Sequence, residues 1–240
     1  MTKHRITRQE IKHDEFVSTV GRMTRWAEDN ARTLLLGVAA ALVLFLGIYG
    51  FLQWQRSRNL RAEAALAEVT AAYHGTVAGA QPGAESFASD AERYQAVVER
   101  ADEVIAAYGS TSAADRARYY RGLALFDAGR LDEAAVALDE FLATSPDHFL
   151  APFARWKKAQ LLERRGDLAG ACEGYRGLLD IQDPEFPNEL AYLDLGRCLG
   201  DLGQEAEAAD TYRRMLDAYP DSLYAADARQ RLAELEAAAG

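Results

Sequence analysis

The sequence predicts an all-α protein in which one apolar helix near the N-terminus precedes a solenoid of helical hairpins. Two observations predict this fold. Residues 33–54 form a long apolar run without charge, and several residue columns after residue 112 recur at a step of 37 residues. A fixed period of this size is typical of stacked repeats, in which each unit buries its apolar face against its neighbours. We therefore expect a binding surface and not a reaction centre.

Charge divides the chain at the apolar run. Residues 1–61 carry 10 Lys and Arg against 5 Asp and Glu, a net of +5, and residues 62–240 carry 17 against 32, a net of −15. Such an asymmetry suggests that the two parts face different compartments. The acidic larger part argues against nucleic acid as a partner, because binding nucleic acid requires a basic face.

The basic tail covers residues 1–32. Phe16, Val20, Met23 and Trp26 follow one another at steps of three and four, with arginines among them. This pattern fits an amphipathic segment on an anionic membrane surface. A solvated helical lead-in to the apolar run is the alternative.

Residues 33–54, TLLLGVAAALVLFLGIYGFLQW, predict a single transmembrane helix. At about 1.5 Å per residue the run would extend roughly 33 Å, enough to cross a hydrocarbon layer of ~30 Å. Tyr49 and Trp54 lie toward its end, where aromatic side chains favour the membrane interface. A buried core helix of this length with no polar face is rare, and a cleaved signal peptide would have a shorter leader and a shorter apolar stretch. We predict an uncleaved signal anchor.

The orientation of the anchor rests on the basic residues of the tail. Close to the apolar run, three arginines lie on each side, so the local charge does not indicate an orientation. The whole tail carries these seven basic residues: Lys3, Arg5, Arg8, Lys12, Arg22, Arg25 and Arg32. They predict a cytoplasmic N-terminus and an exported acidic domain. In a bacterium this places the anchor in the inner membrane and the repeat domain in the periplasm.

Residues 55–112 predict a long linking helix, a loop and a divergent first repeat. The stretch 56–74 has neither Pro nor Gly and continues the apolar helix, whereas 75–88 holds three glycines and Pro82 and predicts a loop. Residues 89–108 predict a second helix. A step of 37 aligns Val104-Ile105 of this helix with Phe141-Leu142, so we interpret it as the second half of the divergent repeat.

Residues 113–222 predict three clearer repeats. Their first helices cover 113–127, 150–164 and 187–201, and their second helices cover 131–144, 168–181 and 205–218. Glycine ends a helix readily in the left-handed conformation and proline cannot continue one. The turns and ends are marked by Gly129, Gly166, Gly203, Pro146, Pro184 and Pro220. Residues 223–240 predict a capping helix with a polar outer face.

Each repeat has a small residue at a fixed position on both helices and large residues at fixed positions on the second helix. Gly122, Ala159 and Gly196 hold one column on the first helix, and Ala134, Ala171 and Ala208 hold another on the second. Small residues let the two backbones approach closely. We expect the large residues of the second helix to reach across the pair or meet the next unit: Leu138, Tyr175, Tyr212, Phe141, Leu178 and Met215.

These columns resemble the tetratricopeptide repeat, which has a small residue on each helix, a glycine at the turn and a proline near the end. The step is 37 instead of the family's usual 34, so the connections are longer. The layout of basic tail, with Ile11-Lys12-His13-Asp14-Glu15-Phe16, single span and acidic repeat domain resembles the repeat-domain family of the ancillary SecYEG translocon subunit and the periplasmic cell-division coordinator. The resemblance implies partners among translocon subunits or periplasmic chaperones. The inserted segment 75–88 does not match that family.

No residue pattern predicts catalysis, a metal site or a cofactor. The sequence has no Gly-x-Ser-x-Gly, phosphate-binding glycine loop or His-Glu-x-x-His motif. Acidic pairs such as Asp132-Glu133 lie on second helices and fit a solvated face. Cys172 and Cys198 are not at metal-ligand spacing, and they are either two buried thiols or a disulfide in an oxidising compartment. We predict a protein that is not an enzyme.

The first helices of the repeats predict a protein-binding groove. Helical spacing places these apolar, aromatic and polar residues on the groove: Tyr119, Leu123, Phe126, Phe153, Trp156, Gln160, Leu190, Leu193 and Arg197. Such a surface suits a peptide or helix laid in a groove, although some of these residues could instead belong to the core. Trp156 is the strongest candidate, because aromatic anchors dominate binding energy.

Two functions remain open at this point. In the first, the protein is a membrane-anchored scaffold whose exported domain docks a partner protein or an unfolded chain in secretion or envelope biogenesis near the translocon. In the second, it is a structural, self-associating envelope protein. Gly37 and Ala41 form a small-xxx-small pair in the apolar run that could bring two copies together.

Overall fold

The structure is a computed structural model that describes residues 26, 29–77, 85–181 and 186–239. The predicted basic tail and amphipathic segment lie, apart from Trp26 and residues 29–32, outside the described residues. Residues 1–57 and 58–240 form two separate units, and each is described by itself.

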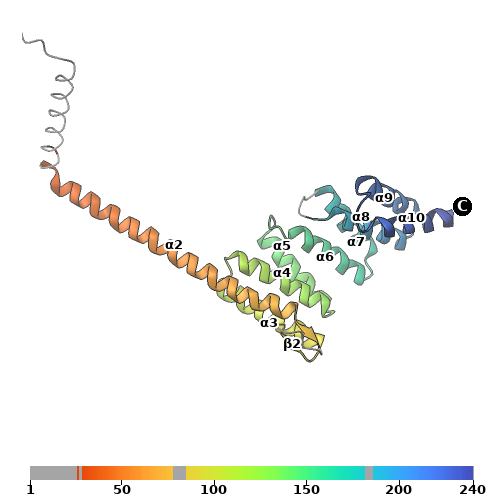
Figure 1. Ribbon diagram of the computed structural model, residues 1–240, viewed down its shortest axis with the longest axis horizontal. Helices are drawn as coiled ribbons and strands as arrows, with labels where there is room; N and C mark the ends of the chain where they lie inside the picture. The colour runs from red at the N-terminus through yellow and green to blue at the C-terminus, as the bar shows by residue number, and fades with distance from the viewer. Residues whose placement is uncertain (1–25, 27–28, 78–84, 182–185, 240) are drawn as a thin grey trace, which may run out of the picture. The chain divides into compact units, whose positions relative to one another are not determined.

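The described chain is almost entirely helical, which confirms the predicted all-α fold (Figure 1). The elements are α2 (Ala31–Tyr73), β1 (Thr76–Val77), β2 (Ser86–Phe87), α3 (Asp90–Tyr108), α4 (Ser112–Asp127), α5 (Leu131–Thr144), α6 (Ala151–Arg164), α7 (Leu168–Ile181), α8 (Asn188–Asp201), α9 (Glu205–Ala218) and α10 (Ala225–Ala239).

The first unit contains the apolar part of α2. Residues 31–56 are all exposed, so this stretch has no core to cover it. The helix is long and apolar enough to cross a membrane, by length and composition. By length and composition the stretch fits a membrane anchor or a signal sequence.

The second unit begins with the last turns of α2, which pack against α3. Ala62, Leu66, Val69 and Ala72 are buried at steps of four and three, the spacing of one helical face. They share a core with residues of α3, including Val97 and Val104, and of α4. The C-terminal part of α2 thus contributes to one core together with α3 and α4.

The segment between α2 and α3 differs from the predicted loop because its ends pair as a short parallel ladder. Thr76 lies opposite Ser86, and Val77 lies opposite Phe87. Phe87 is buried, and a Cβ added at Gly75 would lie 2.6 Å from its ring. A glycine is therefore needed where the chain leaves α2. Two-residue strands have no alternation that a sequence pattern can show.

Two arginines of α3 hold this segment in place. Arg93 donates a hydrogen bond of 2.8 Å to the carbonyl of Tyr73, and Arg100 forms a bidentate ion pair with Glu85 at 2.5 and 2.6 Å. The planar guanidinium is suited to this paired geometry. The ends of the insertion thus belong to the packed unit.

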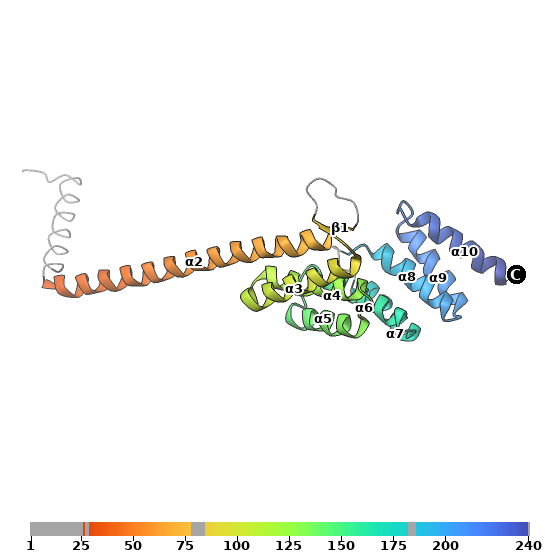
Figure 2. The ribbon, with the colours of Figure 1, turned by 90° about the horizontal axis from the view of Figure 1, so that it is seen from below.

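Three helical hairpins lie where the repeat step predicts them. Each first helix begins one residue from the predicted start and ends at the predicted residue, and the second helices have the predicted bounds. The pairs α4–α5, α6–α7 and α8–α9 follow one another in chain order (Figure 2). Gly129, Gly166 and Gly203 have φ values of 75°, 84° and 79°. Residues other than glycine rarely adopt this left-handed conformation, so the turn column is a backbone requirement.

Close approach of the paired helices explains the small-residue columns. A Cβ added at Gly122 would lie 2.7 Å from Leu138, and one added at Gly196 would lie 2.6 Å from the ring of Tyr212. In the middle repeat, Ala159 has a Cβ, and the opposing position is Gly174. Leu138, Tyr175, Tyr212, Phe141, Leu178 and Met215 are all buried, as the repeat columns predict.

On two first helices and on the capping helix, an arginine bonds to the connection that precedes the helix. Arg118, Arg155 and Arg229 donate hydrogen bonds of 3.1, 3.3 and 3.2 Å to the carbonyls of residues 109, 146 and 220, each nine positions earlier. The three arginines are separated by one and two periods of 37 residues. These bonds satisfy carbonyls near helix ends that would otherwise lack an intrahelical partner. At the remaining position of the column stands Tyr192.

The two cysteines form a disulfide that joins α7 to α8. Cys172 and Cys198 have Cα atoms 5.7 Å apart, and both side chains are buried. This separation lies in the usual range for disulfides. Of the two alternatives left open by the sequence, the structure has the disulfide.

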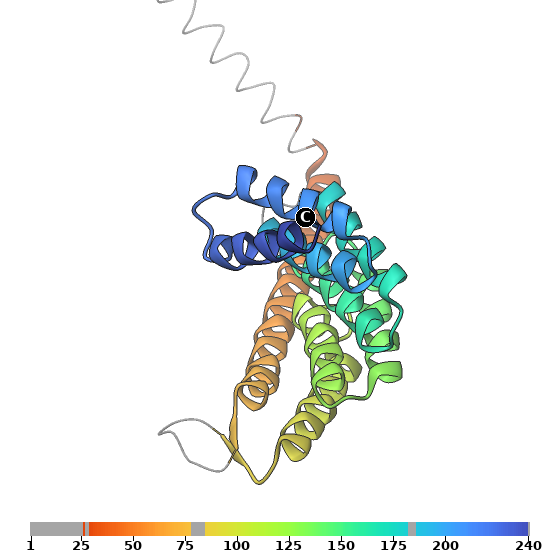
Figure 3. The same ribbon diagram turned by 90° about the vertical axis from the view of Figure 1, so that its right-hand side faces the viewer.

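The last helix, α10, packs against α9 and begins two residues later than predicted (Figure 3). Ala228 is buried, and Leu232 and Leu235 are partly buried against the core of the last repeat. The opposite side of the helix is exposed at Arg229, Gln230, Glu234 and Glu236. A helix with one apolar and one polar side closes a stack, as a capping helix must.

We expect Ala171→Leu to destabilise the repeat domain by about 1–3 kcal/mol, because Ala171 is completely buried against the preceding helix and overpacking a core is costly. This corresponds to a fall in Tm of roughly 2–12 °C. Thermal unfolding of the full chain in detergent measures the effect. Glu173→Gln, an exposed change two residues away, is the control. Equal Tm values for the two variants would show that the packing register is wrong.

We expect non-reducing digestion to yield one peptide pair in which Cys172 is joined to Cys198. Reduction should lower the free energy of unfolding by about 3 kcal/mol, because the bond closes a loop with a sequence separation of 26 residues. Peptide mass spectrometry and thermal unfolding with and without reductant test both statements. Full alkylation of both thiols in protein isolated without reductant would contradict the pairing.

Candidate functional site

The first helices α4, α6 and α8 carry the nine residues predicted to line a groove, and the structure divides these residues into two groups. Leu123 and Phe126 are buried, with exposed fractions of 8% and 3%. Phe126 packs with Leu161 of the next first helix. The half-buried residues are Tyr119, Phe153, Trp156, Gln160, Leu190, Leu193 and Arg197.

The burial of Leu123 and Phe126 corrects their placement on an open surface. Helix α4 is packed between α3 on one side and α5 on the other, so it has little free surface. The position equivalent to Phe126 in the next repeat is Glu163. Helical spacing identifies the face on which a residue lies but not how much of that face the neighbouring helices cover.

Trp156 is oriented by contacts with two other segments. Its indole Nε1 donates a hydrogen bond of 2.7 Å to Asp194 of α8, and its ring lies 6.3 Å from that of Phe186. Phe153 meets the same Phe186 ring edge-on at 5.2 Å. A half-buried ring fixed in this way loses little freedom when a partner contacts it, which favours binding. The structure thus brings Phe153 and Trp156 together beside α8.

Arg197 lies in an ionic network that connects α6 and α8. It forms ion pairs with Glu163 and, at 2.9 Å, with Asp194. Tyr175 donates a hydrogen bond of 2.9 Å to Glu163. Burial alone would raise the pKa of Glu163, but the hydrogen bonds from Arg197 and Tyr175 hold it below its usual value. Glu163 therefore stays ionised. Its ion pair with Arg197 links α6 to α8 in the absence of a partner protein.

The remaining predicted residues are dispersed along the unit. Tyr119 contacts Phe141 with ring centroids 5.7 Å apart, and Leu193 packs near Tyr212. Burial raises the pKa of Tyr119 above its ordinary value. Gln160 accepts a hydrogen bond of 2.9 Å from Lys157. The predicted residues thus pack against different parts of the core: Phe153, Trp156 and Leu190 against one cluster, Tyr119 against a second and Leu193 against a third.

Sequence reasoning missed Asp194, Glu163 and Lys157, which surround the Trp156 cluster. The signal was available in the repeat alignment. The column that contains Lys157 and Asp194 has Tyr120 in the preceding repeat, whereas the columns of Leu138 and Phe141 keep large, mainly apolar residues at every step. A change of residue type from repeat to repeat indicates a position that the packing shared by all repeats does not constrain.

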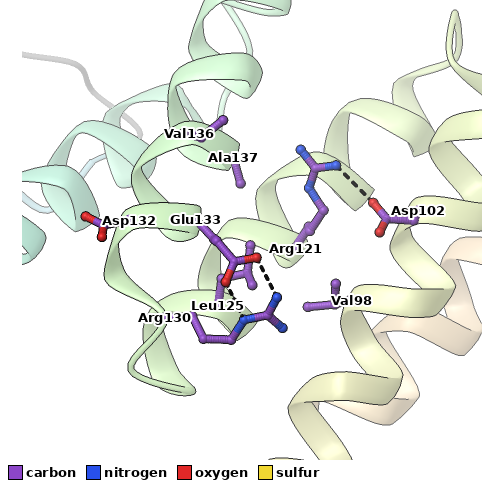
Figure 4. Close-up of a pocket in the computed structure, with 9 residues that line it drawn as sticks. All are labelled: Val98, Asp102, Arg121, Leu125, Arg130, Asp132, Glu133, Val136 and Ala137. Carbon is purple, nitrogen blue, oxygen red and sulfur yellow. Dashed lines mark hydrogen bonds and ion pairs between the residues drawn. The ribbon is translucent and has the colours of Figure 1, made fainter.

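A second surface, also missed, is a cleft between α3, α4 and α5. Figure 4 shows its apolar lining, formed by Val98, Leu125, Val136 and Ala137, and Val136 is 67% exposed. The cleft has a volume of about 400 Å³. It was missed because the second helices were interpreted as simple solvated faces.

Ion pairs border this cleft. Arg121 bonds to Asp102 at 2.9 Å, and Arg130 bonds to Glu133 at 2.5 Å (Figure 4). A similar cleft of about 440 Å³ lies two repeats later between α7, α8 and α9. There Asp210 takes the place of Val136, so the exposed apolar residue is confined to the first cleft. Both clefts are open and polar at the rim, and neither holds a nucleophile aligned with a base.

The described residues offer no group of three or more His, Cys, Asp or Glu side chains that could hold a metal ion. Acidic side chains near Trp156 are engaged with arginine, tyrosine or indole donors. The chemistry of this face is therefore hydrogen bonding, ion pairing and aromatic contact, which is the chemistry of recognition.

Comparisons with known proteins agree with this description. The sequence matches the tetratricopeptide repeat-like domain family over residues 24–237. It is 29% and 28% identical, each over 132 residues, to the outer membrane protein assembly factor BamD of two Xylella fastidiosa strains, 9a5c and Temecula1. These matches cover 55% of this chain and 39% of the relatives, so the chain spans about two fifths of their length.

Two crystal structures are similar in fold. Both contain nearly identical tetratricopeptide-like repeats assigned to a kinesin light chain of Podosopora anserina. Each has a TM-score of 0.52 and 19% sequence identity, and each match covers 62% of this chain and 79% or 80% of the other. At this identity the likeness concerns the fold alone. The family match covers most of the sequence, and the chain belongs to the tetratricopeptide repeat-like family.

Proposed function

We propose that the protein is a membrane-anchored scaffold whose repeat domain docks a partner protein or an unfolded chain. The observation that carries the proposal is Trp156, a half-buried aromatic ring held by Asp194 on a first helix of a stacked-repeat domain. Ordered aromatic side chains of this kind act as anchors at protein interfaces. Repeat folds of this family generally mediate protein interactions, which supports a role in protein binding.

The membrane anchor is α2. Its exposed apolar stretch at residues 33–54 is uncharged, and its later turns are buried in the repeat domain at Ala62, Leu66 and Val69. One helix thus belongs both to an apolar segment without a protein core and to the core of the domain. The basic residues of the tail favour a cytoplasmic N-terminus.

We place the repeat domain in the periplasm of a bacterium, in secretion or envelope biogenesis near the translocon. Three observations support this setting: the acidic charge of residues 62–240, the disulfide, which persists in oxidising compartments, and the similarity to an outer membrane protein assembly factor. The layout that resembles the ancillary translocon subunit supports the same setting. Translocon subunits and periplasmic chaperones are the partners we propose.

Self-association is the second candidate function. A Cβ added at Gly37 would meet nothing within 4 Å, so this position of the small-xxx-small pair with Ala41 is open to a second helix. Leu60 is 72% exposed on the same helix. Mass measurement of the detergent-solubilised full chain separates the two candidates, because a client-free dimer supports self-association and a monomer supports the scaffold.

We expect the protein to remain in the membrane fraction after carbonate washing, because a 22-residue uncharged helix is stable in the hydrocarbon layer. Protease added to cells with a permeabilised outer membrane should digest the chain beyond residue 60 and spare the tail. Antibodies to each end identify the fragments. Digestion of the tail with protection of the domain would reverse the orientation.

We expect Trp156→Ala to weaken capture of the partner more than it weakens folding. A central aromatic anchor contributes ~2–4 kcal/mol to binding. Site-specific crosslinking from the repeat domain in native membranes measures capture, and thermal unfolding of the same preparation measures stability. Trp156→Phe keeps a ring but loses the bond to Asp194, and Phe149→Ala removes an exposed aromatic residue elsewhere. Unchanged capture with a large loss of Tm would assign Trp156 to the core.

A further inference from the structure

Among the described residues of the repeat domain, a few cations form no ion pair. Of the 17 Arg and Lys residues after residue 85, 12 form ion pairs with described carboxylates. Arg155 and Arg229 donate to backbone carbonyls instead. Three cations then have no carboxylate partner among the residues described: Lys157, Arg164 and Arg214.

Lys157 and Arg164 form a cluster on the first-helix face, because both lie over the ring of Phe126. The Lys157 Nζ is 4.5 Å from the centre of that ring, and the Arg164 guanidinium carbon is 4.0 Å from it. Lys157 also lies 5.1 Å from the ring of Trp156. Lys157 therefore adjoins the aromatic residue on which the proposed function rests, and Arg164 lies over the same Phe126 ring.

The cations are held in place by neutral groups. Lys157 donates to the side-chain oxygen of Gln160 at 2.9 Å, and Arg164 donates to the backbone carbonyl of Phe126 at 3.0 Å. Lys157 is half-buried and Arg164 is exposed. Burial lowers the pKa of Lys157 and Asp127 opposes the shift. Lys157 is partly desolvated and forms no ion pair with a described carboxylate, so it gains from an incoming anion that bonds to it directly.

The surroundings restrict the form of that anion. Asp127 and Asp194 lie near enough to act on Lys157, and residues 62–240 carry a net charge of −15. A strongly acidic segment would be repelled by this field. A segment with one carboxylate among apolar residues meets less repulsion, its carboxylate can pair with the cations over the Phe126 ring, and an apolar neighbour can contact Trp156.

We propose that Lys157 and Arg164 bind one Asp or Glu side chain of a bound polypeptide segment that is otherwise apolar. The inference rests on the proposed function, since it requires that the first-helix face bind polypeptide. It adds the chemistry of the segment: one carboxylate between the two cations, with apolar residues on the Trp156 side. Arginine supplies a planar pair of donors for the carboxylate and lysine supplies a compact charge.

The test uses the full chain in nanodiscs of zwitterionic lipid and three fluorescent peptides of Leu, Phe and Ser that differ only in a central Glu, Gln or Lys. Fluorescence anisotropy gives each Kd. We expect the Glu peptide to bind about 5- to 10-fold tighter than the Gln peptide, with the Lys peptide weakest. The preference should shrink between ~50 mM and ~500 mM salt, because salt screens exposed charges.

Variants identify the residues responsible. In the double variant Lys157→Gln with Arg164→Gln, the ratio of the Gln to the Glu peptide Kd should fall to about one, while the Kd of the Gln peptide stays constant. The exchange Lys157→Arg with Arg164→Lys keeps both charges and should keep the preference. Arg214→Gln is the matched control, because Arg214 also has no ion pair with a described carboxylate and lies over a ring, that of Tyr192, on another helix.

The outcomes separate the two proposals. Equal binding of the Glu and Gln peptides, or a Glu preference that survives the double variant, overturns the inference and leaves the scaffold function intact if Trp156→Ala still weakens binding. Failure of all three peptides to bind at either salt concentration counts against both proposals. Loss of the preference in Arg214→Gln as well would show a general charge effect and would also overturn the inference.

Discussion

The close approach of two helices within each hairpin is the contact on which the repeat domain depends. At Gly196 the neighbouring helix comes so near that a single added carbon would meet the ring of Tyr212. Only at this separation can the large residue cross the pair and become buried. The distance also determines which side of each first helix remains uncovered, so the recognition face is a consequence of how the core packs.

Much of the fold could be predicted because the repeat constrains the same positions several times. The turn glycines and the buried column of Leu138, Tyr175 and Tyr212 have one physical role in every unit, and the period made them visible. The two-residue strands could not be predicted, since they are too short for a pattern. The disulfide could only be left as one of two alternatives, because 26 residues of separation do not fix a distance in space.

The candidate site was predictable only in part, for a related reason. Trp156 stands out by residue type, but its partner Asp194 is 38 positions away, one residue more than the period, in a column that varies. Phe126 looked equally suitable and is buried because α4 is enclosed on both sides. Ionic contacts are the least visible from sequence. An arginine shows no sign of whether it will meet a carboxylate, a carbonyl or a ring, and these differences separate Arg197, Arg155 and Arg164.

The disulfide lies at a particular boundary of the stack. The arginine that bonds back to the preceding connection is present at residues 118, 155 and 229, but Tyr192 replaces it on α8. Cys172 and Cys198 join α7 to α8 at this same boundary. A linear stack loses structure from its ends, one unit after another. With this crosslink, fraying that starts at α10 can pass through α9, but α8 stays tethered to α7, and the repeats that carry Trp156 are protected from disorder that begins at the C-terminus.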